Sequence, residues 1–265
     1  MKHRPVIPRS PAFATTLANG LSVLECFRGG DLVLSNRDLA ERTGLSTATI
    51  SRMTYTLALK GLLMYDAQLR RYRLGAGVLS LSHVLLSGMG LRQLARSRMR
   101  ELADAVGGTV SLGIYDRRHM VYVETCRGHV LTVFRPDIGA RLPIMATAMG
   151  RAWLASADSR ERQAVLDELE QREPEQLQRF PGVLEAARLD WDSHGYCVSE
   201  GDWLADVHAV GVPMRMLVGG ERFVFNCGVV RSRLKAGELR SEVAPRLRAM
   251  VDDIGRLVGE EGGGT

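Results

Sequence analysis

The sequence predicts an α+β fold, with an N-terminal winged helix-turn-helix followed by a larger C-terminal domain built on an antiparallel sheet. Three observations lead to this prediction. Two short helical patterns meet at a glycine turn, a run of strands precedes a run of helices in the second half, and basic residues concentrate near the N-terminus. At 265 residues the chain is longer than a single domain of roughly 100–200 residues, so we expect two domains.

Composition places the chain among water-soluble globular proteins, with 45% hydrophobic and 25% charged residues. No stretch approaches the roughly 18 consecutive apolar residues of a membrane span, and the N-terminus leads into no long apolar segment. The cysteines are scattered singly, which suits reduced thiols better than disulfides. We therefore expect a cytoplasmic protein with no membrane partner.

The basic charge is unevenly distributed. Residues 1–75 hold 11 Lys and Arg against 5 Asp and Glu, whereas residues 76–265 hold 24 against 25. Neutralisation of phosphates by Lys and Arg is the main sequence-independent contribution to DNA affinity. The N-terminal part is thus expected to attract a polyanion, although a basic face that only aids solubility would show the same excess.

Three helical patterns open the chain. Apolar residues recur at helical spacing from Leu17 to Phe27, and a second helix is expected over 37–43 behind a cap at Ser35 or Asn36. A third helix opens at 45–47, with its apolar residues on one face and its polar residues near the outward start. Two short helices joined by a tight glycine turn form a helix-turn-helix, whose second helix enters the major groove.

The elements that follow predict a wing, a linker helix and the second domain. Strands at 62–65 and 71–74 form a hairpin, and helical spacing continues over 78–89 and 91–106. Beyond them we expect strands at 110–114, 120–125, 130–134, 207–214 and 222–229, and helices at 147–155, 159–170, 183–193 and 239–257.

Polar side chains on the third helix are the candidates for reading DNA bases. Hydroxyl and guanidinium groups near the start of such a helix reach base edges or phosphates, which selects Thr47, Thr49, Ser51 and above all Arg52. The alternative is that Thr47 or its neighbour Ser46 only caps the helix and that Arg52 pairs with an acidic residue. The wing arginines Arg70, Arg71 and Arg73 are expected on the DNA backbone or in the minor groove, or in solvent for at least one of them.

From about Ala14 to Val258 the chain resembles the IclR family of bacterial transcriptional regulators. The resemblance is carried by DLAERTGLSTATISR at 38–52, RYRLG at 71–75 and GARLPIMATAMGRA at 139–152, with GY at 195–196, VGVP at 210–213 and FNCG at 225–228 further on. Two residues depart from the family pattern: Asn19 stands where the family commonly has Arg, and Arg151 replaces the usual Lys.

The resemblance implies a GAF-like effector domain, dimers built through the DNA-binding half, and in many members tetramers built through the effector half. We expect a winged helix-turn-helix over 14–76, a linker helix over 77–90 and an effector-binding domain over 91–258. The expected partners are double-stranded DNA with a palindromic operator, a small-molecule effector, and further copies of the chain in a homodimer or homotetramer. No cofactor is expected.

The effector is expected near a helix start in the central motif, where unpaired backbone N–H groups and the helix dipole favour an anion such as a carboxylate. This argument covers Met145, Ala146, Thr147, Ala148 and Gly150. By resemblance, the opposite wall of the pocket consists of His208, Ala209, Asn226 and Gly228. His208 could equally be a strand histidine with no ligand role.

Two half-motifs, Cys126-x-x-His129 and His194-x-x-Cys197, would supply four zinc ligands if they met. We do not expect a metal site, because each motif is only half of one.

The leading hypothesis is a regulator in which a small organic acid or aromatic effector biases two arrangements of a dimer and so the spacing of its DNA-reading helices. An enzyme is not expected, because no GxSxG, HExxH or GxxxxGK[ST] motif occurs. A DNA-binding protein whose second domain only oligomerises is the remaining alternative.

Overall fold

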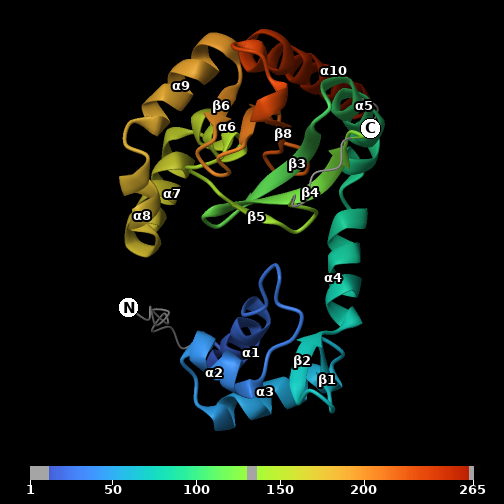
Figure 1. The fold of residues 1–265 in the computed structure, drawn as a ribbon, viewed down its shortest axis with the longest axis vertical. Helices are drawn as coiled ribbons and strands as arrows, with labels where there is room; N and C mark the ends of the chain where they lie inside the picture. Colours follow the sequence, from blue (N-terminus) through green and yellow to red (C-terminus); the bar gives the residue numbers. More distant parts are fainter. Residues whose placement is uncertain (1–11, 130–135, 263–265) are drawn as a thin grey trace. The chain divides into compact units, whose positions relative to one another are not determined.

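A computed structural model of the chain describes residues 12–129 and 136–262 (Figure 1). It divides into two compact units, residues 1–88 and 89–265. The first unit contains α1 (Thr15–Glu25), α2 (Asn36–Thr43), α3 (Thr47–Leu59), β1 (Leu63–Asp66), β2 (Arg71–Leu74) and α4 (Ala76–Ser87).

Local sequence explains where α2 and α3 begin and end. Ser35 and Asp38 form a capping box at the start of α2, since each side chain accepts a hydrogen bond from the other residue's backbone N–H. Gly44 ends α2 with φ of 74°, a left-handed conformation that favours glycine. Ser46 then caps α3 by accepting from the Thr49 backbone N–H at 3.2 Å. The turn of the helix-turn-helix is therefore encoded within a few residues.

The three helices pack around a small apolar core, and a two-stranded wing completes the unit. Val23, Leu39 and Ile50 are fully buried at its centre. The strands β1 and β2 pair antiparallel, with Leu34 bridging β2 at Tyr72. This arrangement leaves the start of α3 and the tip of the wing outside the core.

The second unit consists of one six-stranded antiparallel sheet and helices on both faces. Its elements are α5 (Gly90–Val106), β3 (Thr109–Asp116), β4 (His119–Arg127), β5 (Arg141–Pro143), α6 (Ala148–Ser156), α7 (Ser159–Arg172), α8 (Pro174–Arg179), α9 (Val183–His194), β6 (Cys197–Glu200), β7 (Val207–Pro213), β8 (Val224–Val230), a short 3₁₀ turn (Arg231–Arg233), a π turn (Leu239–Val243) and α10 (Ala244–Gly262). The strand order is β5-β4-β3-β8-β7-β6. The strand expected over 130–134 lies outside the described residues.

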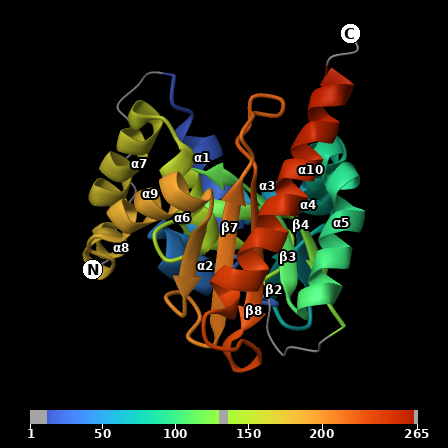
Figure 2. The ribbon, with the colours of Figure 1, turned by 90° about the horizontal axis from the view of Figure 1, so that it is seen from above.

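The helices form two layers around the sheet. α5 and α10 contact each other and cover one face, while α6 packs on the other face with α9 beside it (Figure 2). The close approach of α6 to the loop before it depends on Gly150, where an added Cβ would lie 2.1 Å from the Ile144 carbonyl oxygen. The α+β prediction is confirmed, and β5, β6 and α8 are elements that the sequence pattern did not predict.

Candidate functional site

The start of α3 presents a polar surface to solvent. Thr47, Ser51 and Arg52 are exposed, whereas Thr49 is half-buried and its hydroxyl lies 2.9 Å from that of Ser46. Within the part of the chain that the structure describes, the Arg52 guanidinium forms no ion pair. Thr49 is thus engaged in capping, while Arg52 is available to an incoming polyanion.

Two further residues shape this surface. The side-chain amide of Asn36 on α2 donates to the Ser51 hydroxyl at 3.2 Å, so α2 holds Ser51 in place. Tyr55 follows one turn after Ser51 on the same face and is 66% exposed. Sequence reasoning passed over Tyr55 because an aromatic residue at helical spacing also fits a core position.

The wing arginines differ in their surroundings. Arg70 lies in the hairpin turn with φ of 51°, and Arg71 forms an ion pair with Asp38 at 3.3 Å. Arg73 Nη2 lies 2.9 Å from the sulfur of Met64 on the neighbouring strand. All three side chains are exposed, so the unit carries cationic groups along the wing as well as on α3.

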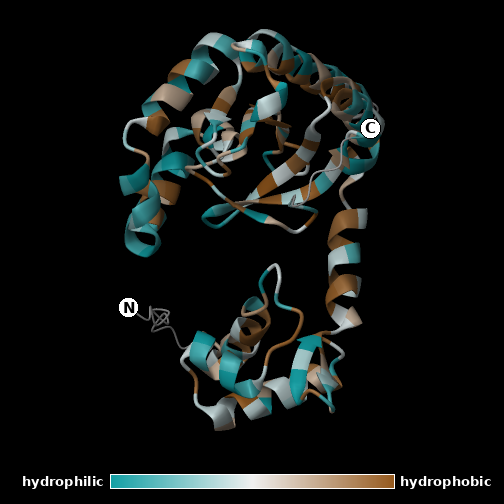
Figure 3. Ribbon diagram, viewed as in Figure 1, coloured by the Kyte–Doolittle hydropathy of each residue, from teal (hydrophilic) through white to brown (hydrophobic). Residues whose placement is uncertain are grey.

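Helix α4 is apolar and has no buried residue. Its ribbon is largely brown in Figure 3, and Leu79 and Val84 are 73% and 72% exposed. Leu17 and Leu21 on α1 are exposed in the same unit. Monomeric soluble proteins rarely leave a helix with so many large apolar side chains in water.

The second unit contains an apolar cavity of about 80 Å³ between the sheet and the start of α6. Its walls come from all six strands of the sheet, Pro136 before β5, the start of α6, and the loop after β6. The lining residues are Thr109, Tyr122, Pro136, Leu142, Thr147, Ala148, Ser199, Trp203, Leu204, Val207, Ala209, Asn226, Gly228, Val229 and Val230.

The polar groups among the described lining residues are neutral. Asn226 donates its side-chain amide to the Tyr122 hydroxyl at 3.2 Å, and burial raises the pKa of Tyr122 to about 12, so the phenol stays protonated. Thr147 caps α6 by accepting from the Gly150 backbone N–H. Among the described residues 12–129 and 136–262, no Lys, Arg or His side chain lines the cavity. An anion here would rely on hydrogen bonds and on the start of α6.

Arg151 ties together the segments that carry the cavity walls. The buried guanidinium donates from Nε to the Met145 carbonyl and from Nη1 to the Val198 carbonyl, both at 2.9 Å. Its Nη2 lies 2.8 Å from Asp202 Oδ2 as an ion pair without the alignment of a hydrogen bond. The loop before α6, strand β6 and the loop carrying Trp203 therefore meet at one side chain.

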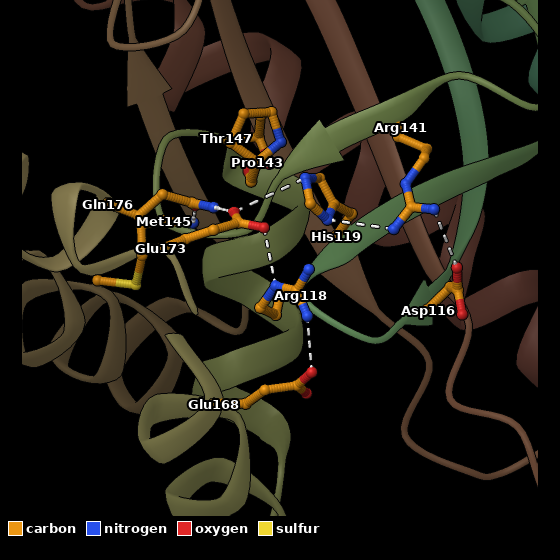
Figure 4. Close-up of polar contacts among 10 residues, drawn as sticks. All are labelled: Asp116, Arg118, His119, Arg141, Pro143, Met145, Thr147, Glu168, Glu173 and Gln176. Atoms are coloured by element: carbon orange, nitrogen blue, oxygen red, sulfur yellow. Dashed lines mark hydrogen bonds and ion pairs between the residues drawn. The ribbon is translucent and has the colours of Figure 1, made fainter. Parts of the chain in front are cut away.

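A second polar cluster supports the loop before α6 (Figure 4). Arg118, in the β3–β4 turn, donates to Glu168 at 2.7 Å and to Glu173 at 2.8 Å. Gln176 of α8 accepts from the Met145 backbone N–H at 3.4 Å. This cluster fastens α7 and α8 to the sheet edge, and none of its four side chains is among the lining residues of the cavity.

Family models match both units. A model described as the IclR helix-turn-helix domain matches residues 16–67, and one described as the bacterial transcriptional regulator IclR C-terminal domain matches residues 83–256. The chain belongs to the IclR family of bacterial transcriptional regulators. Its N-terminal unit is accordingly a helix-turn-helix DNA-binding domain, which confirms the resemblance drawn from the motifs.

Relatives of this IclR-family chain extend over nearly its full length. It is 34% identical to the HTH-type transcriptional regulator TsaQ1/TsaQ2 of Comamonas testosteroni, over 90% of this chain and 86% of that protein. The crystal structure of an IclR family regulator from Brucella abortus matches with a TM-score of 0.82 and 35% identity, covering 96% of both chains. An IclR homolog from Microbacterium hydrocarbonoxydans, solved with 4-hydroxybenzoate, matches with a TM-score of 0.69 and 21% identity over 91% of this chain and 99% of that one. These relatives are described as transcriptional regulators or as homologs of one.

The cavity contains five of the residues expected to bind an effector: Thr147, Ala148, Ala209, Asn226 and Gly228. The other four lie elsewhere. Met145 and Ala146 are buried in the loop behind α6, with the Ala146 carbonyl accepting from Ser199, and Gly150 packs on Ile144. His208 lies in a groove on the other side of the sheet with Glu200 and Arg231, because successive side chains of a strand point to opposite faces.

Sequence reasoning missed Tyr122, Ser199 and Trp203. The period of two along β8 could have added Val230 to Asn226 and Gly228. No comparable signal indicates Tyr122 or Trp203. Tyr122 lies on β4 and Trp203 in the loop after β6, and both are distant in sequence from the motifs that identified the other cavity residues.

The two Cys/His half-motifs lie apart. Cys126 is on β4 and Cys197 on β6, with three strands between them, and each thiol is buried against a backbone carbonyl. Among the described residues no group of three or more His, Cys, Asp or Glu side chains could hold a metal ion. No described helix is long and apolar enough to cross a bilayer.

Proposed function

We propose that this IclR-family chain is a ligand-responsive regulator that acts in the cytoplasm, reads a palindromic operator as a homodimer or homotetramer, and changes its DNA affinity when a small organic acid occupies the cavity. The observation that carries the proposal is a mostly apolar cavity with neutral hydrogen-bonding groups near the start of α6 among its described lining residues. A DNA-binding protein whose second domain only oligomerised would have no need of such a cavity.

DNA reading is assigned to Arg52, Ser51 and Tyr55 on α3, with Thr47 at its start. The exposure of Arg52 supports a base or phosphate contact, and the wing arginines supply phosphate contacts. Thr49 is a weaker candidate for a DNA contact because its hydroxyl already lies close to that of Ser46.

Dimer formation is assigned to α4. An exposed apolar helix is stabilised when a second copy covers it, and two copies related by a two-fold axis would present two α3 helices to a palindromic site. Replacing Leu81 and Leu85 together by Asp should lower the molecular mass measured by light scattering to that of a monomer of 29.2 kDa. Unchanged mass in that variant would move the dimer interface elsewhere.

The ligand is inferred from the cavity walls. Because the described lining residues include no cationic side chain, the structure favours binding of a carboxylate by backbone N–H groups of α6 and by the Tyr122 and Asn226 side chains. The apolar remainder favours a short aliphatic or aromatic body. The Microbacterium relative solved with 4-hydroxybenzoate makes that acid the first probe, with lactate as a smaller one.

DNA selection from a random pool tests the DNA-binding part of the proposal. The recovered site should be an inverted repeat, and Arg52→Ala should weaken its binding by about 1–3 kcal/mol, roughly 5- to 150-fold. Lys60→Ala, at the exposed far end of the same helix, is the matched control and should cost less. No enriched sequence from a folded wild type would reject the proposal.

Tryptophan fluorescence tests the ligand part, since Trp203 lines the cavity. A carboxylate probe that binds should change the emission of the wild type and not of Trp203→Phe, with calorimetry confirming that Trp203→Phe still binds. A broad panel of acids that neither changes emission nor releases heat would favour the oligomerisation-only alternative.

A further inference from the structure

A buried ion pair lies at the start of α5. Arg92 donates from Nη2 to Glu124 Oε2 at 3.0 Å and from Nε to the Val123 carbonyl at 2.6 Å. Only 16% of the Arg92 side chain and 4% of the Glu124 side chain are exposed. Buried ion pairs add little net stability because both charges lose water, so their value lies in fixing one arrangement.

The acceptor of the Arg92 bond belongs to a β-bulge. Between β3 and β4 the register pairs Leu112 with Glu124 and Gly113 with Tyr122, which leaves Val123 as an extra residue without a partner on β3. Bulges bend a strand, redirect side chains and are often found next to functional sites. The carbonyl of this extra residue is held by Arg92.

The bulge joins the cavity to the opposite face of the sheet. Tyr122, on its near side, lines the cavity, while Glu124, two residues later, is buried against α5. In a regular strand, two residues separated by one other share a face. Because Val123 is an extra residue, Tyr122 and Glu124 face opposite sides of the sheet. A short stretch of β4 therefore connects a cavity wall to the Arg92 ion pair.

Chain continuity adds the last link. Arg92 lies in the first turn of α5, which begins at Gly90, and the first unit ends at Gly88. A displacement of the bulge would act on the first turn of the helix that follows the DNA-binding unit in the chain, after Gly88 and Met89.

We propose that Arg92 is a coupling residue: occupancy of the cavity moves Tyr122 and the Val123 bulge, and Arg92 transmits that movement to the start of α5. The proposal rests on the proposed function, because the cavity must be the effector site for the coupling to serve regulation. Arg92 touches no ligand and acts through Val123 and Glu124.

Helix α5 offers a matched control. Arg100 Nη1 donates to the Arg127 carbonyl at 3.1 Å, so it joins the same helix to the same strand. Neither Arg100 nor Arg127 lines the cavity. A contact that only fastens α5 to the sheet would behave like Arg100.

Hydrogen exchange of the full-length protein tests the proposal without DNA or an identified ligand. Ala209→Leu fills part of the cavity, and Tyr122→Phe removes one hydroxyl from its wall with less risk to folding. Each is introduced into the wild type, Arg92→Gln and Arg100→Gln, and exchange is followed at residues 94–99 of α5 and 123–126 of β4 by mass spectrometry. A second background, Arg92→Met with Glu124→Met, removes both buried charges and guards against unfolding.

In the wild type and in Arg100→Gln, we expect at least one cavity substitution to change α5 exchange by about threefold or more, a coupling in the usual range for residues between two sites. With Arg92→Gln, or with both charges removed, the change at β4 should persist and the change at α5 should disappear. An equal α5 response with and without Arg92, or no α5 response in the wild type, overturns the proposal. Failure of the DNA selection would instead reject the proposed function. It would not change what the exchange rates show about the contact between Arg92 and the bulge.

Discussion

Replacing Arg151 by Lys should destabilise the second unit although the charge is kept. Lys presents a point charge where Arg presents a planar fork, and this fork has separate partners in the Met145 carbonyl, the Val198 carbonyl and Asp202. One ammonium group cannot reach all three. At least one buried carbonyl therefore loses its donor.

The magnitude follows from these contacts. A hydrogen bond from a charged donor contributes about 1.5–3 kcal/mol, and an orphaned buried acceptor costs a similar amount. The Asp202 side chain is 36% exposed, so solvent screens its ion pair and we assign it little. We expect Arg151→Lys to cost about 2–3 kcal/mol, and Arg151→Met, which removes every donor, about 3–5 kcal/mol.

Thermal unfolding measures the effect directly. For a unit of this size each kcal/mol lowers Tm by roughly 2–4 °C, so Arg151→Lys should melt about 4–12 °C below the wild type. Arg160→Lys, the same change at an exposed position on α7, should melt with the wild type. If Arg151→Lys and Arg160→Lys melt together, the fork is not what holds the cavity walls.

Two further predictions concern the same part of the molecule. Burial alone would raise the pKa of Glu173, but hydrogen bonds led by Arg118 outweigh burial and hold that pKa below its usual range. The stabilising contribution of the Glu173 carboxylate is therefore present above about pH 4.5 and is lost as the pH falls through the lowered pKa. Urea unfolding between about pH 5 and pH 3 should therefore show a smaller loss of stability in Glu173→Gln than in the wild type, and parallel curves would contradict this. Gly150→Ala should cost about 1–3 kcal/mol in the same assay because the new Cβ meets the Ile144 carbonyl, whereas Gly255→Ala, with open space around its Cβ in α10, should be neutral or stabilising. Equal stability of the two alanine variants would show that α6 can move away from the loop that precedes it.

The N-terminal unit was the more predictable one, because its signals are local. The Ser35 and Ser46 caps and the glycine at position 44 fix both helices within a few residues of sequence. The apolar residues of α1 show what local signals do not predict. Helical spacing identified the helix, yet Leu17 and Leu21 do not pack in the core of the unit and remain exposed to solvent.

The second unit was less predictable, because short elements and long-range contacts determine it. Strand β5 has three residues and α8 has six, too few for a periodic pattern to stand out. The cavity residues found from sequence belong to motifs on α6, β7 and β8, whereas Tyr122 and Trp203 join them only through tertiary packing. His208 and Ala209 are neighbours in one motif, and only the register of β7 shows that they face opposite sides of the sheet.

That pair of neighbours provides the most direct test of the central claim, that filling the cavity changes DNA binding. The affinity for the selected operator is measured by fluorescence anisotropy for wild type, Ala209→Leu and His208→Leu, with dimer mass and Tm as controls. Ala209→Leu, which enlarges a side chain inside the cavity, should change the dissociation constant by about fivefold or more, the lower end of usual allosteric coupling, while His208→Leu on the other face should leave it unchanged. Equal affinities for all three folded, equally assembled proteins would contradict the account.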